Sequence, residues 1–105
     1  MKVVEIAFSV YPVTDLKRAR AFYEETLGSL LDADTRSSID PLGTLENFFL
    51  YNGNLSETAR AMHLHRNSLL YRLGRIEELL GHSLEDSELR LSLQIALKIR
   101  HVLEH

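Results

Sequence analysis

The feature that most constrains the fold of this chain is a pair of helical segments within residues 54–81, separated by about three residues. Asn54 suits the position before a helix because its side-chain oxygen can accept a hydrogen bond from the first turn, and Glu57 completes the spacing of a capping box. The second segment begins at Arg66 and is closed by Gly81, a residue that commonly ends helices. Its apolar positions fall on one helical face: Leu69, Leu73, Ile76 and Leu80.

The connection between the two segments indicates how they are arranged. The first segment ends near Met62, so it is too short to be stable alone and has to pack against its neighbours. His63, Leu64 and His65 form the turn, and Ala59 is small where the two helices come close. Two helices joined by such a turn predict a helix-turn-helix, in which the N-terminal part of the second helix enters the major groove of DNA.

A helix is also expected upstream of this pair. It runs from a cap at Thr14 or Asp15 to about Leu27, and Gly28 is expected just past its end. Residues 29–40 are interpreted as a linker because most of this stretch is polar.

Two further helices complete the pattern. Asp40 caps one of them and Pro41 takes its first position, while Gly53 follows its end. Its expected buried face comprises Leu42, Leu45, Phe48, Phe49 and Leu50. The last helix runs from about Asp86 to Leu103 and has two apolar sides, which is typical of a helix buried on both. The two sides comprise Leu89, Leu93, Ala96 and Leu97, and Leu91, Ile95, Ile99 and Val102.

Residues 3–10 alternate between apolar and polar positions and predict a half-buried strand that Pro12 ends. The expected fold class is therefore mainly α: a helix-turn-helix bundle of four helices with an N-terminal β-strand plus helix appendage. A single strand leaves backbone groups unpaired at its edges, and pairing with the same strand of a second copy would satisfy them. The sequence thus predicts a homodimer formed through the N-terminal strand, the C-terminal helix or both.

The charge pattern separates the helical pair from its flanks. The chain has a net charge of −3, yet residues 52–75 carry four arginines and one glutamate, a balance of +3. Residues 29–51 and 76–105 each carry −3. A local positive field is enough to bind phosphates, because salt limits charge effects to about 8–10 Å. On charge alone, a chance cluster on a solvated helix face remains an open alternative.

The side chains left outside the core form the candidate DNA site. The candidates for base readout are Arg66, Asn67, Ser68, Tyr71 and Arg72. The candidates for phosphate contacts are Asn54, Ser56, His65 and Arg75. Arginine can pair bidentately with guanine and asparagine with adenine, while the positive ends of the two helices favour phosphates. A partly buried aromatic role for Tyr71 is equally open.

No other chemistry is indicated by the sequence. The absence of cysteine excludes disulfides and thiolate metal sites, and no apolar run is long enough to cross a bilayer. His63 and His65 are two residues apart and do not share a helix face, as metal ligands on a helix would. We therefore expect a cytoplasmic protein that is not an enzyme, with no cofactor, no metal, no catalytic residue and no membrane contact.

Two stretches carry a family resemblance, TLENFFLYNGNLSETARAMHLHRNSLLYRLGRIEELLG and LEDSELRLSLQIALKIR. Residues from about 30 to 103 resemble the C-terminal helix-turn-helix domain of PucR/CdaR-type bacterial transcription regulators, with the domain itself expected at 41–103. The matching positions are Gly53, Asn54, Ser56, Thr58, Ala59, His65, Arg66, Asn67, Tyr71, Arg72, Leu73, Arg75, Ile76 and Glu77. Ser68 replaces the usual threonine, and Leu70 stands where a basic or polar residue is common. The resemblance implies double-stranded DNA as the partner and an upstream effector-sensing domain, which is expected to be absent from this chain.

Residues 1–28 carry a different resemblance. Their Val-Thr-Asp-Leu turn and Ala-Phe-Tyr-Glu segment are similar to the first strand and helix of the glyoxalase/bleomycin-resistance/dioxygenase (vicinal oxygen chelate) superfamily. That resemblance implies a fusion near Gly28 and Ser29, a dipeptide that a common cloning junction also encodes. Residues 104–105 resemble the start of a histidine tag.

The function expected from the sequence is sequence-specific binding of double-stranded DNA as the output domain of a bacterial transcriptional regulator. One alternative is a protein-interaction or dimerisation module whose basic face is incidental. The other is an enzyme fragment of the glyoxalase fold, for which the further strands and metal ligands of that family are missing.

Overall fold

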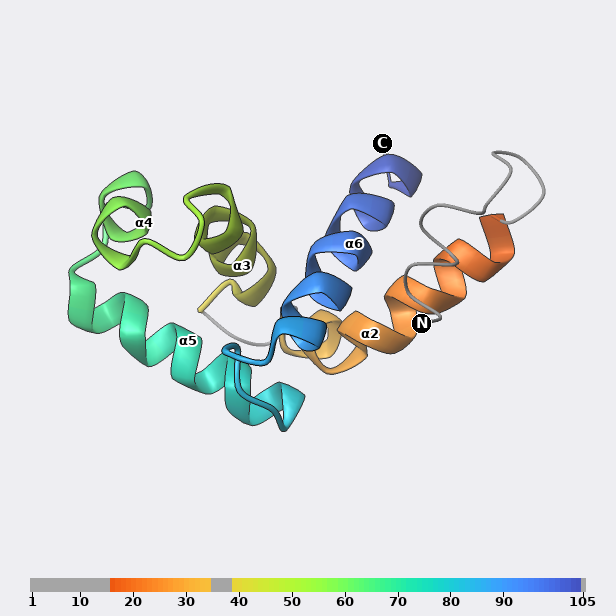
Figure 1. Ribbon diagram of the computed structural model, residues 1–105, viewed down its shortest axis with the longest axis horizontal. Coiled ribbons are helices and arrows are strands. Elements are labelled where there is room, and N and C mark those ends of the chain that lie inside the picture. The colour runs from red at the N-terminus through yellow and green to blue at the C-terminus, as the bar shows by residue number, and fades with distance from the viewer. Residues whose placement is uncertain (1–15, 35–38, 105) are drawn as a thin grey trace. The chain divides into compact units, whose positions relative to one another are not determined.

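The computed structural model describes residues 16–34 and 39–104, and this part of the chain is mainly helical (Figure 1). Its elements are α2 (Leu16–Asp34), α3 (Pro41–Leu50), α4 (Leu55–Ala61), α5 (Arg66–Leu80) and α6 (Ser87–Leu103). The predicted mainly α class is confirmed, and the described ranges contain no strand. The strand expected at residues 3–10 lies outside the described residues.

The chain divides into two compact units. One comprises residues 29–84 and contains α3, α4 and α5, and the other comprises the residues up to Gly28 and from Glu85 onward. The helix α2 contributes to both units, because the boundary falls within it.

The end predicted for the first helix at Leu27 is wrong. The helix α2 continues through Gly28 to Asp34, so the first half of the expected linker is helical. The buried face explains the continuation, since its residues keep a helical spacing beyond the glycine: Tyr23, Leu27, Leu30 and Ala33. A glycine within a helix lowers its stability without ending it, and the apolar face outweighs that effect here.

The start of α3 agrees with the sequence prediction. The Asp40 side chain accepts a hydrogen bond from the Gly43 amide at 3.2 Å, and Pro41 occupies the first turn. The buried face is narrower than expected, because Phe49 is half-buried and Leu50 is 69% exposed. The residues of α3 that are buried are Pro41, Leu42, Thr44, Leu45 and Phe48.

The helical pair forms the predicted helix-turn-helix. The Asn54 side chain accepts a hydrogen bond from the Glu57 amide at 2.9 Å and caps α4. In a capping box the Glu57 side chain would accept a hydrogen bond from the Asn54 amide. Here the Asn54 amide instead donates to the Tyr51 carbonyl at 2.9 Å. In the turn, His63 has a positive φ of 57°, and α5 ends at Gly81 with φ 75°.

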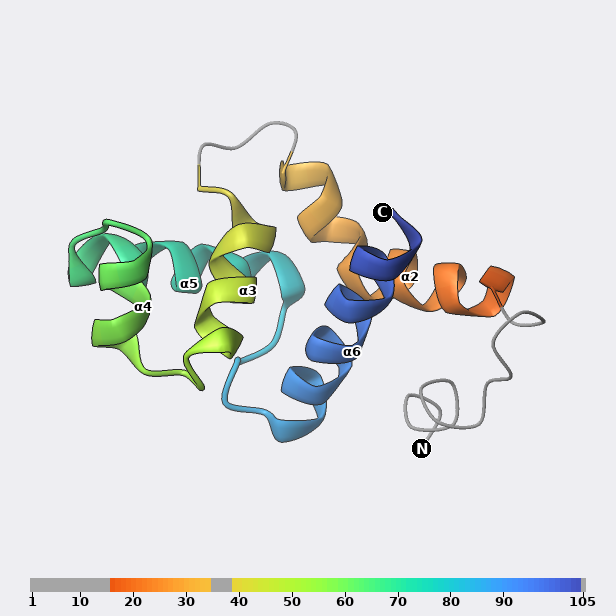
Figure 2. The same cartoon turned by 90° about the horizontal axis from the view of Figure 1, so that it is seen from above.

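The three helices of this unit contact one another in pairs, and Figure 2 shows α3 and α4 side by side, both next to α5. The inward residues of α5 are those expected, namely Leu69, Leu73 and Ile76, while Leu80 is half-buried. Ala59 is 5% exposed, which fits the close approach predicted for it.

The other unit joins the N-terminal part of α2 to α6. Asp86 caps α6, and one side of that helix is buried through Leu93, Ala96 and Leu97. Its second apolar side is not uniformly covered, because Leu91 and Val102 are exposed. None of the described helices combines the length and apolar character needed to cross a membrane.

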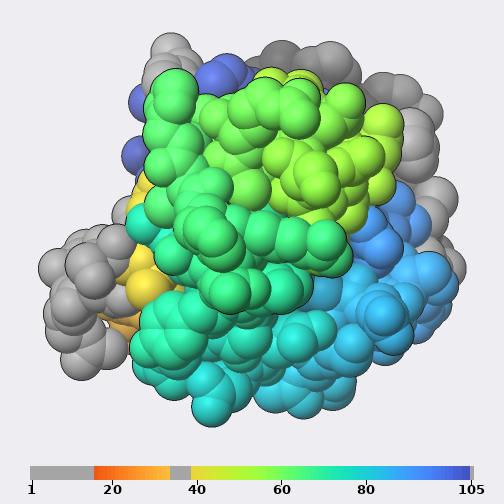
Figure 3. Space-filling model, turned by 90° about the vertical axis from the view of Figure 1, so that its left-hand side faces the viewer, coloured from red at the N-terminus to blue at the C-terminus, as the bar shows by residue number. Residues whose placement is uncertain are grey.

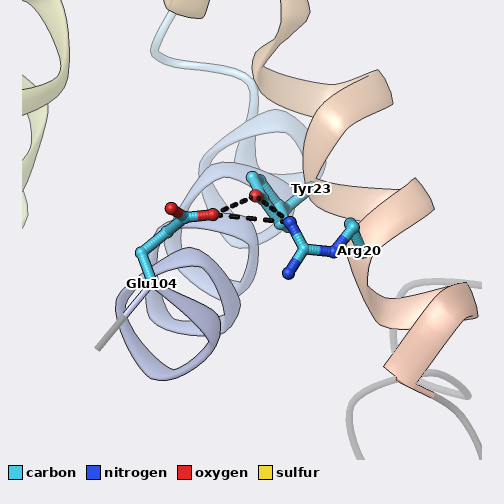
Figure 4. Close-up of polar contacts among 3 residues, drawn as sticks. All are labelled: Arg20, Tyr23 and Glu104. Atoms are coloured by element: carbon cyan, nitrogen blue, oxygen red, sulfur yellow. Dashed lines mark hydrogen bonds and ion pairs between the residues drawn. The ribbon is translucent and has the colours of Figure 1, made fainter.

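A polar cluster connects the two helices of this unit (Figure 4). The Tyr23 hydroxyl donates to a Glu104 carboxylate oxygen at 2.7 Å, and the Arg20 guanidinium lies 3.5 Å from the same oxygen. Tyr23 is only 3% exposed, whereas Glu104 is exposed. Glu104, expected to belong to a tag, therefore makes a specific contact with α2.

Candidate nucleic-acid interface

The N-terminal half of α5 presents the exposed polar face that the sequence predicts. Arg66, Asn67, Ser68 and Tyr71 are all exposed. Within the part of the chain that the structure describes, none of these four side chains has a hydrogen-bond or ion-pair partner. Their donors and acceptors are therefore available to a ligand.

An open depression lies along this face. It is lined by Ile39, Asn67, Ser68, Tyr71 and Arg72, so it brings together four of the five residues predicted to read bases. Arg66 is not part of its lining. Asn67 and Tyr71 are four residues apart and share a helix face, which explains why they line the same hollow.

The sequence predicts that Arg72 points outward, and the structure shows that it does not. It is half-buried, and its guanidinium donates to the Ile39 carbonyl at 2.7 Å and to the Thr44 hydroxyl oxygen at 3.5 Å. Its position next to the inward residue Leu73 turns the long side chain toward the start of α3. Arg72 therefore links α5 to the beginning of α3.

The other members of this link were not predicted from the sequence. Thr44 is fully buried and donates to the Ile39 carbonyl at 3.0 Å and the Asp40 carbonyl at 2.7 Å. The Ile39 carbonyl thus accepts from both Thr44 and Arg72. A threonine within an otherwise apolar helix face was the available signal, because a buried hydroxyl needs a hydrogen-bond partner.

His65 is the N-cap of α5. Its Nδ1 atom accepts a hydrogen bond from the Asn67 amide at 3.1 Å. A neutral imidazole that accepts at Nδ1 carries its hydrogen on Nε2, so the exposed Nε2–H is a donor at the positive end of the helix.

The remaining phosphate candidates lie at different places on the same pair of helices. Asn54 and Ser56 are exposed at the beginning of α4, where Asn54 also serves as the cap. Arg75 lies further along α5 and forms an exposed ion pair with Glu78 at 3.2 Å. Such exposed pairs are weak, so the Arg75 guanidinium can exchange its partner for a phosphate.

Arg60 adds a cation that the candidate set omitted. It lies in the last turn of α4 and is exposed, and its side chain has no hydrogen-bond or ion-pair partner among the described residues. Figure 3 views the molecule from the side of α4, and α4 with the start of α5 occupies much of that face. The sequence counted Arg60 in the positive balance of residues 52–75 but did not single it out as a DNA contact.

Comparison with known proteins finds one matching family model and several similar regulators. The family model described as the PucR C-terminal helix-turn-helix domain matches residues 42–99. The chain is similar to the purine catabolism regulatory protein of Bacillus subtilis (strain 168), with 39% identity over 92 residues, covering 88% of this chain and 17% of that protein. It is 43% identical over 56 residues to the carbohydrate diacid regulator of Escherichia coli (strain K12), covering 53% of this chain and 14% of that protein.

A third relative extends the same pattern. The transcriptional activator PmfR of Paenarthrobacter nicotinovorans is 34% identical over 84 residues, covering 76% of this chain and 18% of that protein. The chain thus spans less than a fifth of the length of each of these three relatives. No solved structure matches the chain significantly.

The comparisons do not support the glyoxalase-type resemblance of residues 1–28. An alignment of 92 residues in a chain of 105 has to begin at or before residue 14, so similarity to the purine catabolism regulatory protein includes the start of α2. The uninterrupted course of α2 across the expected junction at Gly28 and Ser29 agrees with this.

Proposed function

Because this chain belongs to the family of the PucR C-terminal helix-turn-helix domain, a domain of DNA-binding regulators rather than enzymes, we propose that it binds double-stranded DNA sequence-specifically. In this proposal it is the output domain of a bacterial transcriptional regulator. The observation that carries the proposal is the exposed start of α5, where the side chains of Arg66 and Asn67 have no hydrogen-bond or ion-pair partner among the described residues. In a helix-turn-helix this part of the second helix is the one that enters the major groove.

The base-reading roles follow from the chemistry of the exposed side chains. Arg66 can donate two hydrogen bonds to guanine, and Asn67 can pair bidentately with adenine. Ser68 and Tyr71 add a hydroxyl each to the same depression. Arg72 is assigned a smaller part in readout, because its guanidinium is already bound to the Ile39 carbonyl.

The phosphate roles fall to groups at the helix beginnings and along the basic face. The Nε2–H of His65 and the side chains at the start of α4 lie where helix dipoles favour anions. Arg60 and Arg75 add positive charge on the same two helices. Contacts of this kind fix the position of the protein on the duplex and make affinity depend steeply on salt.

The proposal is tested by selecting duplexes from a random pool with the full chain and then measuring variants against the enriched sequence. Arg66→Ala should weaken binding by about 1–3 kcal/mol, or roughly 5-fold to 150-fold, if Arg66 reads a base. Lys98→Ala is the matched control, because it removes the same charge from an exposed position on α6. Equal effects of the two substitutions would contradict a specific role for Arg66.

We also propose that the chain acts as a homodimer in the bacterial cytoplasm, as part of a longer effector-responsive regulator. Support for the dimer comes from the second apolar side of α6, where Leu91 is 36% exposed and Val102 is 72% exposed. Dimeric helix-turn-helix proteins read two half-sites about one helical turn apart, so the selected duplexes should contain an inverted repeat. Light scattering that detects only 12.0 kDa particles at micromolar concentration would count against the dimer.

A further inference from the structure

One exposed apolar side chain stands within the polar face of α5. Leu70 is 44% exposed, and its neighbour Tyr71 is 64% exposed. Leu70 follows the fully buried Leu69, and one residue along a helix turns the side chain by about 100°, so Leu70 points away from the core. Arg66 lies four residues earlier and shares its helix face.

Leu70 is not among the buried residues of α5, which are Leu69, Leu73 and Ile76. Single exposed leucines are common and need no explanation by themselves. This one lies beside Arg66 and Asn67, whose side-chain polar groups have no hydrogen-bond or ion-pair partner among the described residues. A ligand that binds those polar side chains therefore also lies next to Leu70.

The chemistry of the major groove restricts what a leucine can cover favourably. Each base edge in that groove carries hydrogen-bonding groups, and only thymine also presents a methyl group. A leucine over a cytosine amine would remove water from a donor and offer no acceptor in return. A leucine over the thymine methyl buries apolar surface on both sides.

We propose that Leu70 is a specificity-determining residue that recognises the 5-methyl group of thymine. The assignment rests on the proposed function, since it requires α5 to enter the groove. It adds to that function a preference at one base-pair position, carried by apolar contact rather than by hydrogen bonds. Arg66 and Asn67 supply the hydrogen-bonded part of the same readout.

The test uses the full chain and the duplex enriched from the random pool. Each thymine in turn is replaced by deoxyuridine, which keeps every hydrogen-bonding group and lacks only the methyl. At the thymine that Leu70 contacts, affinity should fall about threefold to fivefold, the effect of burying one methyl group. The other thymines should show little change.

Variants connect that loss to Leu70. With Leu70→Ala, the thymine and deoxyuridine duplexes should bind equally at that position, and melting experiments should show an unchanged fold because the side chain is exposed. Leu50→Ala is the matched control, since Leu50 is an exposed leucine on α3 and its removal should leave the discrimination intact.

Three results would overturn the assignment. If the wild-type chain binds the duplex tightly and no deoxyuridine substitution weakens binding, Leu70 does not read a methyl group, although DNA binding stands. If Leu70→Ala retains the discrimination, another residue reads the methyl. If no duplex is enriched at all, the proposed function fails, and the role of Leu70 fails with it.

Discussion

At the residue scale, two histidines of the same turn have different physical roles. His63 adopts a positive φ of 57°, a conformation in which asparagine, aspartate and histidine are enriched among non-glycine residues. His65 has extended backbone angles and accepts the Asn67 amide hydrogen at its Nδ1 atom. One histidine therefore shapes the turn, and the other caps the helix that we propose reads DNA.

The two roles of His65, cap and proposed phosphate contact, are separable by substitution. Asparagine and aspartate both keep a side-chain oxygen for the cap, so His65→Asn and His65→Asp should leave the free energy of unfolding unchanged or raise it by up to about 1 kcal/mol. His65→Asp adds a negative charge where a phosphate is expected, so it should weaken DNA binding well beyond His65→Asn. Thermal unfolding and DNA titrations of both variants check this prediction. Equal DNA affinity of the two variants would show that no phosphate lies near His65.

At the element scale, the connection between α3 and α5 is the finding that the sequence did not foretell. The helical pair itself was predictable, because Asn54, Gly81 and the apolar spacing of α5 are local signals. The end of α2 was not, since the choice between stopping at Gly28 and continuing depends on whether Leu30 finds a buried site. Arg72 was misjudged for the same reason, because its partner at Ile39 is distant in sequence.

Substituting Arg72 should therefore lower the stability of the fold more than it alters the recognition of individual bases. Arg72→Ala removes a hydrogen bond from a charged donor in a half-buried site, so the free energy of unfolding should fall by about 1–2 kcal/mol. Arg75→Ala removes only an exposed ion pair and should cost less than about 0.5 kcal/mol. Denaturant titrations compare the two variants.

The same variant separates positioning from base reading. If Arg72 positions α5, Arg72→Ala should weaken binding by a similar factor for the selected duplex and for each of its single base-pair variants. A loss of discrimination at one base pair alone would instead assign Arg72 to base readout.

At the scale of the whole molecule, the contact between α2 and α6 makes stability depend on pH. The hydrogen bond from Tyr23 holds the pKa of the Glu104 carboxyl below its ordinary value of 4.5, and the nearby Arg20 charge also lowers it. The same hydrogen bond, together with burial, raises the pKa of the Tyr23 hydroxyl above its ordinary value of 10.0. The carboxylate and the neutral phenol thus stabilise each other.

The sign of the acid dependence follows from the direction of the Glu104 shift. Because the folded-state pKa is the lower one, the contribution to stability is present above pH 4.5 and is lost as pH falls through the folded-state pKa. Tyr23→Phe keeps the ring and removes the hydroxyl, so the stability difference between wild type and variant should shrink on acidification. Chemical unfolding of both proteins, from neutral pH to below pH 4.5, measures this stability difference. A difference that does not change with pH would contradict the contact between Tyr23 and Glu104.

We propose above all that the start of α5 reads DNA sequence. The most direct measurement is a fluorescence anisotropy titration of the full chain with the selected duplex and with a scrambled duplex of the same composition, at several salt concentrations. We expect tighter binding to the selected duplex, with affinity for both duplexes falling steeply as salt rises. Equal affinity for the two duplexes at every salt concentration, or no binding to either, would contradict it.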